Sequence, residues 1–209
     1  MAITDRKERE KEKRRNDIIN AAEKLFFLRG YENVTMDDVA KEAELARGTL
    51  YLYFKNKDDI YITIAINGSK ILNNMFVECC QGAKTGIEKI RSLAFAFYEF
   101  SKKYPGYYAA YYYSRMFCFE DFPELGELRR VRMASARMVT DSLHEGIKDG
   151  TVRQDIDPLK ATLILTSFMT SVLTITPVME IYLEGNNWTH DEIIGYAIDM
   201  IIRSVEKKV

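Results

Sequence analysis

The chain has 209 residues, of which 47% are hydrophobic and 29% are charged, and its net charge is −1. These values are ordinary for a globular protein with an ample core. They exclude a protein whose whole surface is basic for nucleic-acid binding. They allow a small nucleic-acid-binding element that contacts few phosphates. Three cysteines, with Cys79 and Cys80 adjacent, do not make a disulfide framework, so we expect reduced thiols and a cytoplasmic protein.

A run of alternating charge opens the chain. Residues 4–15 have no apolar face, so we expect solvated or frayed helix there and no signal peptide. Two interpretations stay open for this run. It is either an arm that contacts the DNA backbone through Lys13, Arg14 and Arg15, or a tail that only increases solubility.

Three helices are predicted in the next forty residues or so. The first covers residues 18–30, where apolar residues share one face and a glycine ends the helix. A short second helix starts after Thr35, a good N-cap, with Asp38 as a weaker substitute for the Glu of a capping box. After a tight turn at residues 44–45, a third helix is predicted over residues 46–53.

The third helix is predicted to turn a polar and aromatic edge outward. Its inward anchors are Leu50 and Phe54. The outward set is then Arg47, Gly48, Thr49, Tyr51 and Tyr53. Two short helices joined by a tight turn, the second carrying a positive charge, a small polar group and phenols, indicate a helix-turn-helix reader of duplex DNA. The alternative is that both tyrosines are packing residues and that Arg47 is an ordinary surface residue.

Four residues of this segment suit the DNA backbone. The hydroxyl of Thr35, with the free N–H groups at the start of the second helix, suits a phosphate. Tyr51 and Lys57 are expected to hold phosphates on either side of the groove. Tyr53 is expected to contact a phosphate or the methyl group of thymine.

Two further residues suit the bases themselves, and a third allows the reading helix to approach the DNA. Arg47 and Thr49 lie at the start of the reading helix, where base edges are within reach, and Arg is the usual partner of guanine. Gly48 allows the helix to come close to the DNA backbone.

The rest of the chain also indicates helices. They are predicted to begin after Asn56 and to cover about 87–104, 123–149, 157–183 and 189 onward, with a segment crowded with aromatic residues at 107–119. The uncharged stretch 161–179 is expected to be a buried helix and not a membrane span, because threonines recur every four residues and a proline interrupts it. We predict an all-α fold of about nine helices, with a helix-turn-helix domain at 1–57 and a helical domain at 58–209.

Residues 18–60 resemble the DNA-binding domain of the TetR family of transcription regulators. The matching residues are Ala21, Ala22, Leu25, Phe26, Gly30, Tyr31, Thr35, Val39, Ala40, Gly48, Thr49, Leu50, Tyr51, Phe54 and Lys57. The resemblance implies that the positions of Arg47, Gly48, Thr49, Tyr51, Tyr53 and Lys57 lie at or near DNA. It also implies a following all-helical domain for ligand binding and dimerisation.

Two residues depart from the family pattern. Glu44 stands in the turn where glycine is common, and a left-handed backbone there would cost a glutamate about 1 kcal/mol. Ala46 stands where Ser or Thr usually caps the reading helix, and loss of that cap costs about 1 kcal/mol. Neither change removes a DNA-contacting group.

The aromatic segment has two interpretations. The first is an effector pocket lined by Phe97, Phe100, Tyr104, Tyr108, Tyr112 and Phe117, with phenols as hydrogen-bonding groups. The second is simple core packing. If a pocket forms, its aromatic lining favours a hydrophobic or flat aromatic compound, including an acyl chain.

The C-terminal helices carry more apolar surface than a monomer needs, so we expect a homodimer that presents two readers to a palindromic site. An effector would then release a repressor from DNA. The alternative is an all-helical carrier or metal-bundle enzyme without a DNA role. Enzyme chemistry is poorly supported, because Asp141 and His144 make only half of a helical metal site. We therefore expect no catalytic residue, cofactor, metal or membrane partner.

Overall fold

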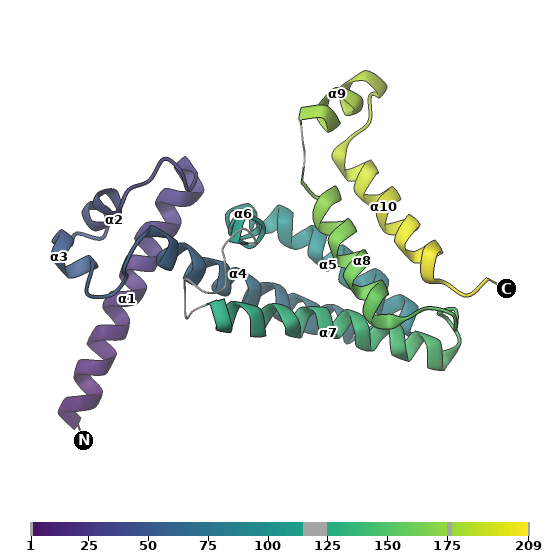
Figure 1. Ribbon diagram of the computed structural model, residues 1–209, viewed down its shortest axis with the longest axis horizontal. Coiled ribbons are helices and arrows are strands. Elements are labelled where there is room, and N and C mark those ends of the chain that lie inside the picture. The colour runs from purple at the N-terminus through teal and green to yellow at the C-terminus, as the bar shows by residue number, and fades with distance from the viewer. Residues whose placement is uncertain (1, 115–124, 175–176, 209) are drawn as a thin grey trace. The chain divides into compact units, whose positions relative to one another are not determined.

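The computed structural model describes residues 2–114, 125–174 and 177–208. Ten α-helices make up these ranges (Figure 1). They are α1 (Ala2–Arg29), α2 (Met36–Glu42), α3 (Arg47–Leu50), α4 (Lys57–Cys80), α5 (Gly86–Lys103), α6 (Pro105–Tyr113), α7 (Leu125–Asp149), α8 (Pro158–Val172), α9 (Pro177–Asn186) and α10 (His190–Val205). The only strand-like pairing in the described ranges is an isolated bridge between Val152 and Glu206, so the predicted all-α class is confirmed.

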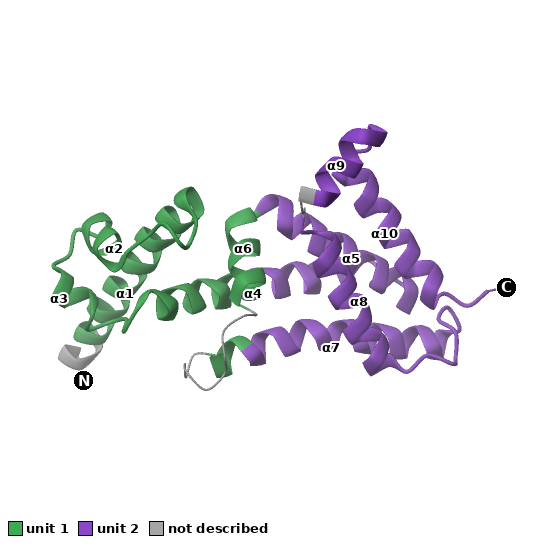
Figure 2. Cartoon of the chain, turned by 45° about the horizontal axis from the view of Figure 1, so that its top comes forward, with its two compact units in different colours: residues 1–69, 104–128 green, residues 70–103, 129–209 purple. Residues whose placement is uncertain are grey.

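The chain divides into two compact units (Figure 2). Unit 1 contains residues 1–69 and 104–128, and unit 2 contains residues 70–103 and 129–209. Helix α4 contributes residues to both units. The functional division at residue 57 stays a prediction.

Unit 1 is built around the apolar face of α1. Ile18, Ala22 and Leu25 are buried on this face, and the helix packs against α2 and α6. The core continues through Leu50 of α3 and Phe54, both almost completely buried. The short α2 and α3 are too small to bury a core of their own, so their position depends on this contact with α1 and α4.

Helix α6 sits closely against its neighbours in unit 1. A Cβ added at Gly106 would lie 2.3 Å from ring atoms of Phe27, and one added at Gly68 would lie 2.9 Å from the Cβ of Tyr107. The Tyr107 hydroxyl donates to Glu23 Oε1 of α1 at 2.8 Å. Burial raises the pKa of Glu23, against the lowering effect of the hydrogen bonds from Tyr107 and Asn67. The contact therefore places under α6 a carboxylate whose charged form is disfavoured by burial.

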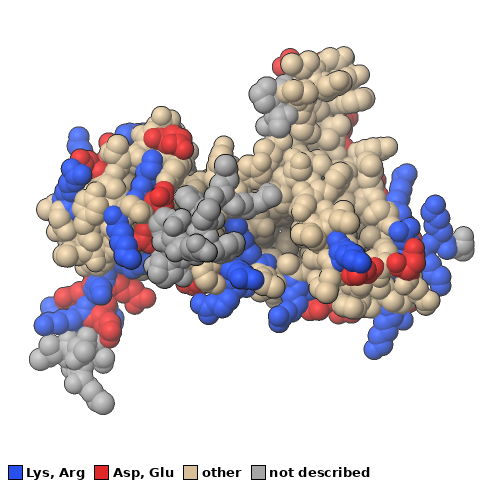
Figure 3. Space-filling view, viewed as in Figure 1, with Lys and Arg blue, Asp and Glu red and all other residues tan. Residues whose placement is uncertain are grey.

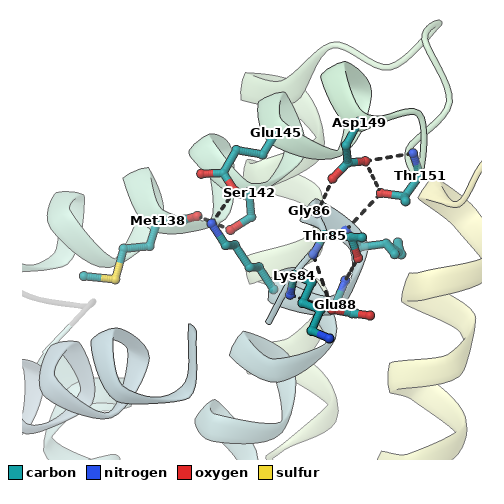
Figure 4. Close-up of polar contacts among 11 residues, drawn as sticks. Lys84, Thr85, Gly86, Glu88, Met138, Ser142, Glu145, Asp149 and Thr151 are labelled. Carbon is teal, nitrogen blue, oxygen red and sulfur yellow. Dashed lines mark hydrogen bonds and ion pairs between the residues drawn. The ribbon is translucent and has the colours of Figure 1, made fainter. Parts of the chain in front are cut away.

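In unit 2, the start of α5 contacts the end of α7 (Figure 4). The Gly86 N–H donates to Asp149 Oδ2 at 2.7 Å, so a side chain that ends one helix caps the start of another. A Cβ at Gly86 would lie 2.1 Å from the backbone nitrogen of Gly146. The two helices thus meet backbone to backbone, which only a glycine permits.

Helix α8 buries threonines together with Leu165 and Met169 on one face and exposes its other large apolar residues on the opposite face. Thr162, Thr166, Thr170 and Thr174 each donate to the carbonyl four residues earlier. Thr162 is buried and lies 2.8 Å from the hydroxyl of Thr140. The opposite face exposes Leu159, Leu163, Ile164 and Phe168. The threonines that suggested close helix approach therefore pack within unit 2.

The charged run is exposed helix, as predicted, and it continues into the first helix without a break from residue 2. The structure differs from the prediction at two prolines. Proline opens α6 at 105 and α9 at 177, and it cannot donate the hydrogen bond that a continuing helix requires. The aromatic segment therefore contains a helix of its own, and the predicted helix over 157–183 ends at Val172. The predicted start at residue 123 lies outside the described residues.

The predicted starts of three other helices are confirmed. Asn56 accepts from the Asp59 N–H at the start of α4. Asp157 caps α8, and Thr189 with Glu192 forms the capping box of α10. None of the helices in the described ranges is both long and apolar enough to cross a bilayer.

Candidate nucleic-acid interface

The start of α2 is fixed by a complete capping box. Thr35 is the N-cap, its hydroxyl accepts from the Asp38 N–H, and the Asp38 carboxylate accepts from the Thr35 N–H at 2.8 Å. These hydrogen bonds with Thr35 hold the pKa of Asp38 below its ordinary value. Asp38 thus completes the capping box in place of a glutamate, and its hydrogen bonds orient the exposed Thr35.

The turn before α3 has the strained geometry that the sequence predicted. Glu44 has φ 53, in the left-handed region that favours glycine, and Ala46 caps α3 without a side-chain hydrogen bond. Both departures from the family pattern are therefore present in the structure, and each is expected to cost about 1 kcal/mol.

Helix α3 is a single turn, four residues long where eight were predicted. Leu50 is fully buried, whereas Arg47 and Gly48 are exposed and Thr49 is half-buried. Tyr51 is 42% exposed, so its ring is available at the surface. The outward placement predicted for Arg47, Gly48 and Tyr51 is present in the structure, whereas Thr49 is only partly exposed.

Arg47 is held by a neighbour from α2. Its Nε lies 3.0 Å from Asp37 Oδ1, and its Nη1 donates to Asp37 Oδ2 at 3.2 Å. The guanidinium also lies 5.7 Å from the centre of the Tyr51 ring. Because both side chains of the ion pair are mostly exposed, the pair orients Arg47 more than it stabilises the fold.

Lys57 and Tyr53 lie less freely than predicted. The Lys57 ammonium donates to the Tyr31 carbonyl at 2.9 Å and lies 4.1 Å from the centre of the Tyr31 ring. The Tyr31 hydroxyl donates to the carboxylate of Asp58, whose pKa is raised by burial. Tyr53 is half-buried against the core of unit 1. Lys57 therefore has to leave or share the Tyr31 carbonyl in order to hold a phosphate.

Arg15 has contacts within unit 1 that neither interpretation of the charged run predicted. It lies 4.8 Å above the ring of Phe54 and its Nη2 donates to the Thr63 hydroxyl at 3.3 Å. The residue is half-buried, because the charged head rests on the aromatic ring beside α3. Arg15 therefore links α1 to Phe54 and α4, and its contact with DNA stays a prediction.

The predicted effector residues fall in both units. Phe97 and Phe100 are buried in unit 2, while Tyr104, Tyr108 and Tyr112 are half-buried in unit 1. Phe117 lies outside the described residues. Their contact with an effector stays a prediction.

One polar group in unit 2 was missed. The Tyr98 hydroxyl donates to the carboxylate of Asp191, which also accepts from Lys102 at 2.9 Å. The two partners are far apart in sequence, so no local pattern could have found the contact.

Among the described residues, no three His, Cys, Asp or Glu side chains gather closely enough to hold a metal ion, and His144 is exposed.

Comparison with known proteins places this reader in a family. Residues 18–64 match the family model described as bacterial regulatory proteins, tetR family. The chain is 25% identical over 162 residues to an uncharacterized HTH-type transcriptional regulator, YhgD, of Bacillus subtilis (strain 168), covering 75% of this chain and 81% of the relative. It is also 25% identical over 144 residues to the HTH-type transcriptional repressor KstR2 of Mycolicibacterium smegmatis, covering 69% and 70%.

A solved structure shares the fold over nearly the whole length. It is the transcriptional regulator FadR from Bacillus subtilis in complex with stearoyl-CoA, with a TM-score of 0.69 and 18% identity. The likeness covers 89% of this chain and 96% of that one. The relatives are regulators, which sets aside the carrier and enzyme alternatives.

Proposed function

Because the chain belongs to the TetR family of transcriptional regulators, we propose that it is a repressor that binds a palindromic operator as a homodimer and leaves it when a hydrophobic small molecule binds. The observation that carries this proposal is the outward edge of α3. Arg47, Gly48 and Thr49 are presented at the surface by the buried anchor Leu50, next to the half-exposed ring of Tyr51.

The proposed dimer rests on the apolar surface of unit 2. Leu159 and Leu163 of α8 are 72% and 69% exposed, and Tyr196 of α10 is 67% exposed. Helices α8 and α10 pack against each other, so these residues belong to neighbouring helices. Apolar surface of this extent on two adjacent helices is typical of a protein interface. A two-fold axis through it would present two α3 edges to two half-sites.

The proposed effector class is a long-chain acyl thioester or a compound of similar hydrophobic character. The support is the aromatic composition of α5 and the likeness to FadR, whose solved structure holds stearoyl-CoA. The effector shifts the operator equilibrium only if it binds the DNA-free conformation more tightly than the DNA-bound one. Stearoyl-CoA should therefore raise the melting temperature of the free protein and weaken operator binding, whereas coenzyme A alone should do neither.

The reader is tested by fluorescence anisotropy on a duplex that the wild-type protein selects from a random-sequence pool. Arg47→Ala and Tyr51→Ala are each expected to weaken specific binding by about 1–3 kcal/mol, which is roughly 5- to 150-fold. Lys24→Ala removes an exposed charge elsewhere on unit 1 and is the control. Circular dichroism checks that all three variants fold. Wild-type affinity in both reader variants would show that α3 is not the reading element.

A further inference from the structure

Three basic residues in the N-terminal turns of α1, Lys7, Lys11 and Arg14, lie on the same side of the helix as its buried residues. We call them the basic stripe. The buried residues Ile18, Ala21 and Leu25 recur at spacings of three and four. The same spacing continued toward the N-terminus reaches Arg14, Lys11 and Lys7. Residues with this repeat lie on one side of a helix. The side that is apolar against the core of unit 1 is therefore basic beyond it.

The three basic residues are available to a partner. Lys7, Lys11 and Arg14 are exposed, and no ion pair or hydrogen bond joins them to another side chain in the described ranges. Arg6, which lies off the stripe, is instead paired with Glu10 at 2.9 Å. Figure 3 shows the charged end of α1 at the lower left, where blue and red side chains occupy the surface.

The stripe starts beside the reader. Arg15, adjacent to Arg14, lies over Phe54 and contacts Thr63, so this turn of α1 is fixed next to the end of the α3 segment. Figure 1 shows the N-terminal turns of α1 continuing past α2 and α3. At 1.5 Å per residue, Lys7 and Arg14 are about 10 Å apart along the axis, which spans about three phosphates of one strand at ~3.4 Å each.

We infer that Lys7, Lys11 and Arg14 form a second DNA contact, with the phosphate backbone next to the groove that α3 reads. This inference rests on the proposed function. DNA is the occupant that matches the stripe, because phosphates are arranged in a line and the three cations have no carboxylate partner of their own among the described residues. The contact adds affinity and register without reading bases.

Two triple variants with equal loss of charge test the stripe. The first combines Lys7→Gln, Lys11→Gln and Arg14→Gln. The control combines Arg6→Gln, Arg9→Gln and Lys24→Gln, which lie on α1 but off the stripe. Affinity of the full-length protein for the pool-selected duplex is measured by anisotropy across a range of salt concentrations, and circular dichroism confirms equal helix content.

The stripe variant should lose about 2–3 units of the slope of log K against log salt, close to 0.9 for each phosphate contact. Its affinity at low salt should fall at least tenfold, while the control should keep most of the wild-type slope. Equal losses in the two variants, or no loss in the first, overturn the stripe while leaving the reader intact. A wild-type protein that binds no duplex overturns the proposed function and the stripe together.

Discussion

The outer surfaces of the two units are specified in different ways. Around α3 in unit 1, exposed groups are polar and several have a defined partner, as Arg47 has Asp37 and Lys57 has Tyr31. On α8 of unit 2, the exposed residues are large and apolar, with Leu163 as an example. A polar edge depends on which residue stands at each position, whereas an apolar face depends mainly on its area. A single substitution near α3 should therefore change one contact at a time. A charge placed on the apolar face of α8 should disturb the whole face.

The largest expected effect is on the apolar face of α8. Leu163→Glu would bury an unpaired carboxylate in the proposed dimer interface, at a cost of several kcal/mol per ion. We expect a monomer in light scattering after size exclusion, with much weaker operator binding. Gln154→Glu adds the same charge at an exposed position outside the helices and should stay dimeric. An unchanged dimer in the Leu163 variant would place the interface elsewhere.

A second prediction compares one glycine in each unit. Gly106→Ala forces a methyl group against Phe27, and overpacking of this kind costs about 1–3 kcal/mol. Gly185→Ala of α9 meets nothing within 4 Å and should gain up to about 1 kcal/mol from helix propensity. Urea unfolding measures both. Phe27→Ala should remove most of the cost of Gly106→Ala, and persistence of the full cost would refute the proposed collision.

A third prediction concerns the carboxylate beneath α6. Glu23 has a raised pKa in the folded state because it is buried, so its ionisation destabilises the fold above that pKa. The penalty is present at neutral pH and disappears below the ordinary value of 4.5, where the group is protonated in both states. Relative to wild type, Glu23→Gln should therefore be more favourable at pH 7 than at pH 4 in thermal melts. A pH-independent difference would contradict the raised pKa.

The smallest expected effect is in the turn before α3. Glu44→Gly removes the left-handed strain at φ 53 and should gain at most about 1 kcal/mol, part of which is offset by the flexibility of glycine in the unfolded chain. Glu44→Ala keeps the strain and is the matched control. Equal melting temperatures for the two variants would show that the turn relaxes without cost.

The local parts of the reader were predictable from sequence. The capping box of Thr35 and Asp38, the anchor Leu50 and the strained Glu44 all depend on residues within one turn of each other. The length of α3 was not, because residues 51–53 continue as turns and no proline or glycine marks the end. The tyrosines at 51 and 53 do not indicate that the helix has ended.

The partners of the reader were beyond the reach of sequence. Lys57 binds Tyr31, 26 positions away, and Arg15 lies on Phe54. Such contacts depend on how α1 and α4 pack, and spacing along the chain does not encode them. In unit 2 the same limit applies to Tyr98 and Asp191. The sequence showed that the region is rich in aromatic residues but not which of them meet a polar group.

The forked pairing of Arg47 with Asp37 has a consequence for discrimination between sequences. In the free protein the guanidinium already has two oxygen acceptors, so DNA has to compete with a rival inside the same chain. A guanine offers two acceptors, O6 and N7, which can replace the two oxygens of Asp37. A base edge with one acceptor would leave the Arg47 guanidinium with one hydrogen bond fewer and the Asp37 carboxylate without its partner. The aspartate thus penalises mismatched sites more than the cognate one, and Asp37→Asn should bind DNA more tightly but choose among sequences less well.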